Sequence, residues 1–299
     1  MSLVDKKPTL LITGASGFTG LHACDYFSRL EFDVVAITNM NSFSNKQIKC
    51  RTCNLSNNES VKELISITKP DYLLHLAGQN AVGLSWDNPI QSLEVNAMAT
   101  AYLLDALRKE MPSCKAVIVG SALQFDPTVP ATFNHPYGLS KTIQTLISQF
   151  WSNQYNMNVV VAQPSNLIGP GFSKGVCSIF AKKIIDMEKA GEEQYLRVSN
   201  LNNHFDFLDV RDAVRAYDFL LRKGENGRSY NVSSGKNHSL QDVINIFKKI
   251  TSIKFQVKVD DTSPLNTFVT LNPTALTELG WQPTTTLESS IRDIIDFYR

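Results

Sequence analysis

Short apolar runs alternate with longer amphipathic runs through the first half of the chain. The apolar runs are rich in Val, Ile and Leu and lie at residues 9–13, 33–38, 72–77, 116–120 and 158–163. Continuous apolar runs of this length are typical of strands buried on both faces of a parallel sheet. The segments between them have the pattern of helices, at residues 18–30, 58–68, 90–110 and 137–155. This alternation predicts an α/β protein with a doubly wound parallel sheet and right-handed crossovers.

The strict alternation loosens after about residue 165. "SKGVCSIFAKKIIDMEKAG" predicts a helix, "YNVSS" a strand, "SLQDVINIFKKI" a helix that opens at Ser239, and "LESSIRDIIDFY" a final helix. We expect residues 1–165 to form the main domain, with a later strand near residues 229–234 rejoining its sheet. Residues 166–299 are expected to form mainly a smaller α/β region.

Composition narrows the class of protein and its partners. The 299 residues are 43% apolar and 19% charged and carry a formal net charge of +1. No segment approaches the ~18 apolar residues that would span a bilayer. This balance predicts a soluble globular protein with a small-molecule ligand, and it argues against nucleic acid or a membrane surface as partner.

Cysteine usage gives the expected compartment and bears on metal binding. The five cysteines are scattered and no signal peptide opens the chain, which favours the reducing cytoplasm. Cys50 and Cys53 have CxxC spacing, but no second Cys or His pair follows at the distance of a zinc site. We therefore expect two ordinary thiols near a strand, and no metal.

Three glycines lie between the first predicted strand and the first predicted helix. In "LLITGASGFTGLHACDYF" they are Gly14, Gly17 and Gly20, spaced G-x-x-G-x-x-G. Glycines at this junction allow a tight turn and a close backbone approach, and the helix amino end attracts a pyrophosphate. The motif predicts a Rossmann-type dinucleotide-binding domain over residues 1–165, with residues 166–299 mainly binding the substrate.

The end of the second predicted strand bears on the cofactor. A protein that prefers NAD usually has an Asp or Glu there to bind the ribose hydroxyls. This chain has Thr38 and Asn39 instead, so nothing repels a 2′-phosphate. The sequence therefore favours NADP(H) over NAD(H), and the basic candidates for the phosphate are Lys46, Lys49 and Arg51.

A tyrosine and a lysine lie four positions apart in "NHPYGLSK". Because positions i and i+4 share one face of a helix, Tyr137 and Lys141 are expected to project together. A phenol with pKa ~10 exchanges protons poorly at neutral pH, and a nearby cation stabilises the phenolate and lowers that pKa. The pair predicts a general acid/base. Ser121, at the end of the fourth predicted strand, is expected to face the same site and to bind the substrate oxygen.

Together these motifs resemble the extended branch of the short-chain dehydrogenase/reductase superfamily. The resemblance rests on "GASGFTG", on Ser121, Tyr137 and Lys141, on "CNLSN" with Asn54 replacing an Asp, on "LLHLAGQNAVG" and on "EVNAMAT". It implies a catalytic Ser–Tyr–Lys triad, with Lys141 also holding the cofactor ribose. The cofactor contacts that it implies are Gly14, Gly17, Phe18, Gly20, Thr38, Asn39, Asn54, Leu55, Leu76, Ala77, Gly78, Tyr137, Lys141 and Pro164. It also implies that Asn96 stabilises the sheet edge, whereas His75 is expected to be a hydrogen-bonded core residue.

The second part of the chain resembles the members that act on nucleotide-activated sugars. "AQPSNLIGPG" is similar to their Arg-Pro-x-Asn-x-x-Gly-Pro motif, and "FDFLDVRDAVRAY" is similar to their Arg-Asp-Phe-x-x-Val-x-Asp signature. Within that branch, "SIFAKKIIDMEKAGEEQYLRVSNL" resembles the Phe-Ala-Lys-Gln-Ile-x-Asp-x-Glu-Lys-Gly helix and Val-Gly-Asn-Leu of the GDP-4-dehydro-6-deoxy-D-mannose reductases. By this resemblance Asn166 and Ser121 contact the substrate. Phe205 replaces the Arg that usually binds the pyrophosphate, which leaves Lys174 and Arg197, with Arg211, as candidate replacements.

Other activities remain open at this point. A nucleotide-sugar 4-epimerase needs only the triad and a tightly held NAD, and it is the main alternative. Ala122 and Leu123 stand where a 4,6-dehydratase carries acidic residues, and Cys177 and His135 lie in no motif of a 3,5-epimerase. A non-catalytic dinucleotide sensor is the third possibility, although such proteins generally lose the Tyr or Lys of the triad. The family resemblance also implies a homodimer formed through the helices near 90–110 and 137–155.

Overall fold

The protein is described by a computed structural model, which divides into two compact units. The described residues are 6–39, 43, 45, 47–129, 134–190, 195–259 and 271–299. Unit 1 comprises residues 1–163 and 214–230, and unit 2 comprises residues 164–213 and 231–299. The chain therefore passes from unit 1 to unit 2, returns to unit 1 for most of one helix and the start of one strand, and passes to unit 2 again.

Unit 1 is built on a seven-stranded sheet in the order β3-β2-β1-β4-β5-β6-β10. The strands are β1 (Thr9–Thr13), β2 (Asp33–Thr38), β3 (Lys49–Thr52), β4 (Tyr72–His75), β5 (Lys115–Val119), β6 (Val159–Pro164) and β10 (Ser229–Val232). Neighbouring strands from β3 to β6 pair in parallel. The predicted doubly wound α/β fold is confirmed.

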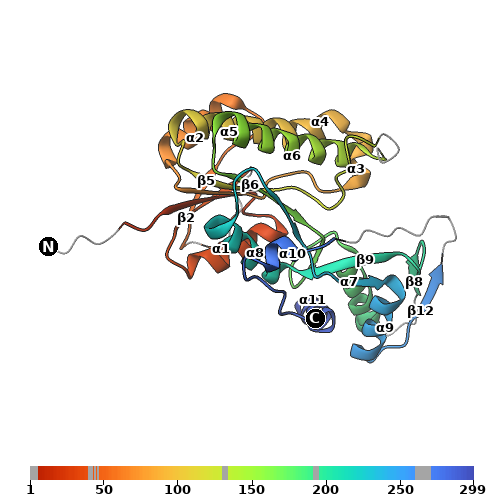
Figure 1. Cartoon of the computed structure of the whole chain (residues 1–299). Coiled ribbons are helices and arrows are strands. Elements are labelled where there is room, and N and C mark those ends of the chain that lie inside the picture. The colour runs from red at the N-terminus through yellow and green to blue at the C-terminus, as the bar shows by residue number, and fades with distance from the viewer. Residues whose placement is uncertain are drawn as a thin grey trace. The chain divides into compact units, whose positions relative to one another are not determined.

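Helices cover both faces of this sheet (Figure 1). One face carries α2 (Asn58–Thr68), α3 (Val82–Asp87), α4 (Pro89–Leu93), α5 (Ala99–Glu110) and α6 (Pro136–Tyr155), and the other carries α1 (Phe18–Ser28) and α8 (Val210–Lys223). A π-helical turn, η1 (Glu94–Met98), joins α4 to α5. The core under α2 and α5 includes Leu11, Ile65 and Leu103, none of which has exposed surface. Covering both faces explains why the strands read as unbroken apolar runs.

Strand register brings three loops of unit 1 to one edge of the sheet. Thr13 of β1 pairs with His75 of β4, and His75 pairs with Ile118 of β5. Because the strands are parallel, the residues that follow each of them leave the sheet at the same edge. The glycine turn, residues 76–78 and Ser121 are therefore neighbours in space although they are far apart in the sequence.

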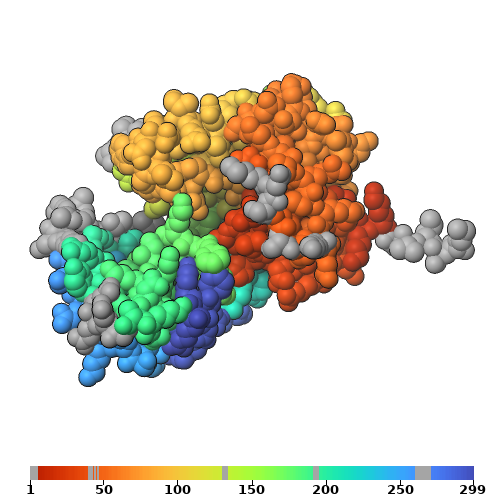
Figure 2. Space-filling model, turned by 180° about the vertical axis from the view of Figure 1, so that it is seen from behind, coloured from red at the N-terminus to blue at the C-terminus, as the bar shows by residue number. Residues whose placement is uncertain are grey.

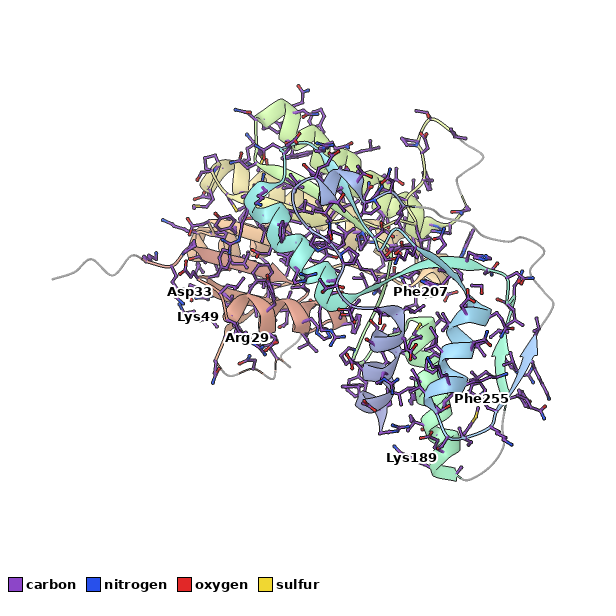
Figure 3. All side chains as sticks on the ribbon, turned by 60° about the horizontal axis from the view of Figure 1, so that its bottom comes forward. Arg29, Asp33, Lys49, Lys189, Phe207 and Phe255 are labelled. Carbon is purple, nitrogen blue, oxygen red and sulfur yellow. The ribbon has the colours of Figure 1, made fainter. Side chains whose placement is uncertain are left out.

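Unit 2 is smaller and is built from short strands and helices. Its strands are β7 (Asn166–Ile168), β9 (His204–Asp209) and β11 (Asn237–Ser239), which form one sheet, and β8 (Tyr195–Val198) and β12 (Gln256–Val259), which form another. Its helices are α7 (Val176–Ala190), α9 (Leu240–Ile250), α10 (Thr274–Thr277) and α11 (Leu287–Tyr298). Phe207 and Phe255, labelled in Figure 3, belong to its apolar core.

Helix α9 begins with a capping motif whose contribution to the stability of the protein can be measured. Ser239 accepts a hydrogen bond from the Asp242 backbone, and the Asp242 carboxylate accepts one from the Ser239 backbone, which completes a capping box. We expect Ser239→Ala to lower the free energy of unfolding by about 1 kcal/mol, measured by urea denaturation. Gln241→Ala, in the same turn and only half-buried, is the matched control and should change stability by less than about 0.5 kcal/mol. Equal effects of the two substitutions would contradict the assignment of the cap.

Candidate active site

The turn between β1 and α1 leaves no room for side chains at two of its glycines. Gly14 has φ +68°, and a Cβ built on it would lie 2.7 Å from the Ala77 backbone nitrogen. A Cβ on Gly20 would lie 2.1 Å from the Gly14 carbonyl oxygen. Both distances are far below van der Waals contact, so only glycine fits. The turn therefore packs directly against residues 76 and 77, which follow β4.

The amino end of α1 suits a bound pyrophosphate. Its N-cap is Gly17, which has no side chain to accept the first N–H groups, and its first turn contains no acidic residue. Unsatisfied N–H groups at a helix start form an anion site together with the helix dipole. Phe18 begins this helix. The tight turn and the uncapped helix together fit the dinucleotide that the glycine motif implies.

The end of β2 contains the residues expected near the cofactor ribose. Thr38 is buried, with its hydroxyl 3.9 Å from the Cys50 sulfur, whereas Asn39 is exposed. Lys49 forms an ion pair of 2.7 Å with Asp33, and the two side chains lie next to each other in Figure 3. Asp33 is the first residue of β2, so this pair lies at the opposite end of the strand from Thr38.

The other residues expected near the cofactor lie in or beside the segment of β3. Lys46 lies outside the described residues, and Arg51 is exposed on β3. Asn54 accepts a hydrogen bond of 3.1 Å from the Ser56 backbone, so its amide shapes the local turn. Leu55 packs against the core under α2. Because an Asp in place of Asn54 would also accept this backbone hydrogen bond, the substitution keeps the turn.

Ser121, Tyr137 and Lys141 come together in unit 1. Tyr137 and Lys141 project from the first turns of α6, and all three side chains are buried. The Ser121 hydroxyl acts on the Tyr137 phenol by lowering its pKa, and it accepts a hydrogen bond of 3.0 Å from the Leu123 N–H. The Lys141 ammonium donates to the Val119 carbonyl oxygen at 2.9 Å, at the end of the strand that precedes Ser121. The roles of these three residues in catalysis stay predictions.

Burial dominates the electrostatics of this cluster. It raises the pKa of Tyr137 above its usual value, and the hydrogen bond from Ser121 offsets only part of that shift. Burial also lowers the pKa of Lys141, to about 8. The sequence predicted a lowered Tyr137 pKa, and the direction is the opposite. The reason is that the phenol loses its hydration on burial, while the Lys141 ammonium donates to Val119 and Gln144.

The start of α6 is held by residues that the sequence did not suggest. Pro136 occupies the first position and has no N–H to satisfy. The Tyr137 N–H donates to the Ser85 hydroxyl at 3.0 Å, and the Gly138 N–H donates to the His135 imidazole at 2.7 Å. Each early N–H of the helix therefore has a partner, which fixes the position of the Tyr137 backbone. His135 caps the helix. The sequence analysis considered this residue only as a possible epimerase residue that lay in no epimerase motif.

Residues 76–78 lie between the glycine turn and the lysine. A Cβ on Gly78 would lie 3.4 Å from the Lys141 nitrogen and 2.8 Å from the Asn96 amide oxygen. Asn96 pins the next residue, Gln79, through hydrogen bonds to both its backbone N–H and its carbonyl. The Asn96 amide also donates to Ser140 on α6 at 2.8 Å. Asn96 therefore joins the loop after β4 to the helix that carries Lys141.

Of the predicted substrate contacts, Ser121 lies in unit 1, and Asn166, Lys174 and Arg197 lie in unit 2. Asn166 begins β7 beside β9 and donates to the Asp206 carbonyl at 3.2 Å. Phe205 on β9 packs against the apolar core of the unit. Lys174 is exposed, and Arg197 donates to the Tyr195 hydroxyl at 3.2 Å. Pro164 ends β6 and is also assigned to unit 2.

Arg211 has a structural role in unit 2. Its guanidinium donates two hydrogen bonds to Asp209, at 2.8 and 2.7 Å, and it also pairs with Asp293 at 2.7 Å. The Asp209 carboxylate is buried and holds the Ser290 hydroxyl as well. These partners raise the pKa of Arg211 further. Asp209 and Asp293 therefore explain the position of Arg211, and no bound ligand is needed to explain it.

The cysteines give no sign of metal binding within the part of the chain that the structure describes. Cys50 is exposed on β3, and Cys53 is buried just after it. The described residues contain no group of three or more His, Cys, Asp or Glu side chains that would hold a metal ion. Burial raises the pKa of Cys177 to about 12, which makes it a core thiol rather than a nucleophile.

Comparison with known proteins identifies the class. The model of the NAD-dependent epimerase/dehydratase family matches residues 10–233. The chain belongs to this family.

Among the described residues no helix combines the length and apolar character needed to cross a membrane.

Three curated relatives of the chain have names that describe three different activities. The chain is 26% identical over 305 residues to the GDP-6-deoxy-D-mannose reductase of Pseudomonas aeruginosa, covering 96% of this chain and 95% of the relative. It is 24% identical over 306 residues to a putative UDP-glucose 4-epimerase of Methanocaldococcus jannaschii, covering 97% and 98%. It is 26% identical over 319 residues to the human dTDP-D-glucose 4,6-dehydratase, covering 97% and 89%.

Solved structures agree on the fold. RMD from Pseudomonas aeruginosa complexed with NADPH superposes with a TM-score of 0.83 at 27% identity, covering 98% of this chain and 97% of that one. The UDP-glucose 4-epimerase of Thermus thermophilus complexed with NAD gives a TM-score of 0.84 at 22% identity, covering 97% and 98%. The family resemblance seen in the sequence is thereby confirmed.

The close packing of the glycine turn can be tested directly. Gly20→Ala places a methyl group against backbone, so we expect a loss of about 3 kcal/mol or more in unfolding free energy and weaker binding of NAD(P)H. Gly83→Ala in α3 is the control, because a Cβ there meets nothing within 4 Å. It should leave stability unchanged or raise it by up to about 1 kcal/mol. Denaturant titration and cofactor fluorescence measure both effects, and similar behaviour of the two variants would contradict the packing argument.

Proposed function

We propose that this protein is an NAD(P)-dependent oxidoreductase that reduces the 4-keto group of a nucleotide-activated 6-deoxy sugar. The observation that carries the proposal is the short distance between the two halves of the site. Residues 76–78 touch the Gly14 turn at one end and approach the Lys141 ammonium at the other. A dinucleotide held by the turn would therefore present its far end to Tyr137 and Ser121. The likeness to the Pseudomonas aeruginosa reductase supports the substrate class.

Each polar group of the cluster has a role in this reaction. A bound NAD(P)H supplies the hydride to the sugar C4. Tyr137 donates its phenolic proton to the carbonyl oxygen, which becomes the 4-hydroxyl. Ser121, whose hydroxyl already acts on the phenol, orients that oxygen. Lys141 holds the cofactor ribose and stabilises the phenolate left on Tyr137, so the raised phenol pKa keeps the proton available for donation at neutral pH.

We infer that the cofactor is NADP(H) rather than NAD(H). The support is chemical, because Thr38 and Asn39 place no carboxylate at the end of β2 where a 2′-phosphate would be repelled. The P. aeruginosa reductase structure holds NADPH, and the T. thermophilus epimerase structure holds NAD.

The substrate contacts of unit 2 belong to the same proposal. Asn166 is proposed to bind the sugar diphosphate, with Lys174 and Arg197 supplying positive charge in place of the arginine that Phe205 replaces. Asn166 directs its amide nitrogen to a backbone carbonyl, which leaves the amide oxygen to accept a hydrogen bond.

A 4-epimerase is the second candidate, and one observation favours it. The relatives include a putative UDP-glucose 4-epimerase with coverage as complete as that of the reductase. The two activities use the same three residues, but an epimerase returns the hydride to the sugar and consumes no cofactor.

The two candidates separate in one experiment. Purified protein is incubated with GDP-, dTDP- and UDP-linked 4-keto-6-deoxy sugars, with NADPH or NADH, and the absorbance of the reduced cofactor is followed. We expect stoichiometric oxidation of NADPH with the GDP sugar. In a parallel incubation with a UDP-hexose and NAD, interconversion with no net change in the cofactor would replace the reductase by the epimerase. Cofactor binding without turnover in either incubation would overturn both.

The role of Tyr137 has its own test. Tyr137→Phe removes only the phenolic oxygen from a buried site, so folding and NADPH binding should persist while kcat falls by about 10²- to 10⁴-fold. Steady-state kinetics and circular dichroism give the two readouts. Tyr155→Phe, at the exposed far end of the same helix, is the control and should retain full activity. Near-normal turnover of Tyr137→Phe would remove the residue from the mechanism.

We also propose that two copies of the chain form a homodimer through the helices near 90–110 and 137–155, which correspond to α4, α5 and α6, together with the adjoining α3. Apolar side chains on these helices are strongly exposed, including Trp86 at 62%, Ile90 at 65% and Phe150 at 50%. On α6, Leu139, Leu146 and Phe150 share one helical face. The segment that contains α3 and α4 forms an outer surface of unit 1, coloured orange to yellow in Figure 2. Exposed apolar surface of this kind marks an interaction site.

Light scattering after size exclusion tests this dimer. The native protein should have the mass of two chains, and the double variant Leu146→Glu with Phe150→Glu should be a folded monomer, because buried carboxylates would face each other across the contact. Phe172→Glu is the control, since Phe172 is 80% exposed in unit 2 and should leave the dimer intact. A monomeric native protein would contradict the assembly.

A further inference from the structure

The Lys141 ammonium is buried without a carboxylate partner in the described part of the chain. Lys141 is 5% exposed, and its nitrogen donates to the Val119 carbonyl and to the Gln144 amide oxygen, both at 2.9 Å. Gln144 lies one turn further along α6 and is completely buried. A buried cation usually has a carboxylate beside it, so a neutral amide in that position needs an explanation.

The direction of each hydrogen bond around Gln144 follows from chemistry alone. An ammonium group has no acceptor, so the amide oxygen must face Lys141, and the amide nitrogen must donate to the Thr100 hydroxyl at 2.9 Å. The Thr100 hydroxyl donates its single proton to the Asn96 carbonyl at 2.8 Å. It then has an acceptor position left for the His75 ring nitrogen Nε2, at 3.0 Å.

This assignment also fixes the histidine. His75 must carry its proton on Nε2, so Nδ1 accepts from the Thr13 hydroxyl at 2.7 Å. Thr13 in turn accepts from the Ala77 N–H at 3.2 Å. Burial and the charge of Lys141 lower the pKa of His75 to about 3, so the ring stays neutral. The network runs from β1, just before Gly14, to Lys141 on α6, and every member other than the lysine is uncharged.

We propose that Gln144 is a positioning residue, which holds the Lys141 ammonium through an uncharged network with Thr100 and His75 and so sets the pH range of catalysis. The proposal rests on the function proposed above. The titratable groups that face Lys141 are His75 from β4 and Tyr137 from its own helix. With His75 neutral, the position of Lys141 depends on two acceptors within the described residues, and the amide supplies one of them.

The physical consequence is that the charge of the side chain at position 144 controls the pKa of Lys141. A carboxylate within 3 Å of the ammonium stabilises the protonated form and raises its pKa by about 1–3 units. A side chain with no acceptor removes half of the hydrogen bonds to the ammonium, which lowers the pKa and loosens the group. Neither effect changes the residues that touch substrate.

The experiment compares Gln144→Glu and Gln144→Met with Gln149→Glu, a control on the same helix whose amide bonds Ser229 instead. Lys141 is observed by NMR of ¹³C-labelled lysine, assigned by its absence in Lys141→Met, and kcat and KM are measured against pH. We expect Gln144→Glu to raise the lysine titration and the upper limit of the kcat profile by about one unit or more. Gln144→Met should lower both and reduce kcat by about 10- to 100-fold, with a smaller change in KM.

The outcomes are decisive in either direction. A folded Gln144→Glu whose lysine titration and pH profile match those of the control overturns the proposal. If Gln144→Glu does not fold, Thr100→Val and Thr100→Ser decide. The Val variant should lose kcat and shift the profile, and Ser, which keeps the hydroxyl, should restore both; a Val variant that behaves as wild type overturns the proposal. A shifted lysine titration in a protein that turns over no nucleotide sugar would leave the network correct and refute the function.

Discussion

Three residues of backbone, Leu76 to Gly78, connect the glycine turn to Lys141, and the rest of the proposed site depends on this contact. Gly14 leaves no space for a methyl group on one side, and Gly78 faces Lys141 and Asn96 on the other. The strip follows β4, whose register with β1 is set by buried apolar pairs such as Leu11 with Leu73. Packing of the sheet core therefore fixes the distance between the glycine turn and Lys141.

The polar groups behind this strip explain why a lysine can be buried there. Its ammonium donates hydrogen bonds to two fixed acceptors, which replace water, and the neutral His75 adds no competing charge. The same dehydration raises the pKa of Tyr137. A buried phenol that holds its proton beside a cation that stabilises the product phenolate is suited to proton donation, which is the direction that a reductase needs.

The sequence predicted the main sheet of unit 1 because its strands are buried on both faces and read as apolar runs. It missed β3, whose four residues Lys49–Thr52 are all exposed and mostly polar. It read residues 90–110 as one helix, whereas a π-helical turn at Glu94–Met98 divides it. The strands of unit 2 span only three to six residues and pair with partners far along the chain, as Asn237 does with Asp206, so no local pattern marks them.

For the site, spacing alone was enough to group Tyr137 with Lys141, and Gln144 stood at i+3 on the same face without being recognised. Ser85 and His135 carried no signal, since their partners are backbone N–H groups that only the fold brings near. The direction of the Tyr137 pKa shift was wrong because it depends on how deeply the phenol is buried. Burial of a single hydroxyl cannot be read from the residues beside it in the chain.

The most direct measurement of the central claim follows a label from the cofactor to the sugar. NADPH carrying deuterium at both C4 positions of the nicotinamide is incubated with the protein and GDP-4-dehydro-6-deoxy-D-mannose, and the product is analysed by mass spectrometry and NMR. The account predicts one deuterium at the sugar C4 for each NADPH oxidised. A reduced sugar without deuterium at C4, or oxidation of NADPH with no label in the sugar, would contradict it.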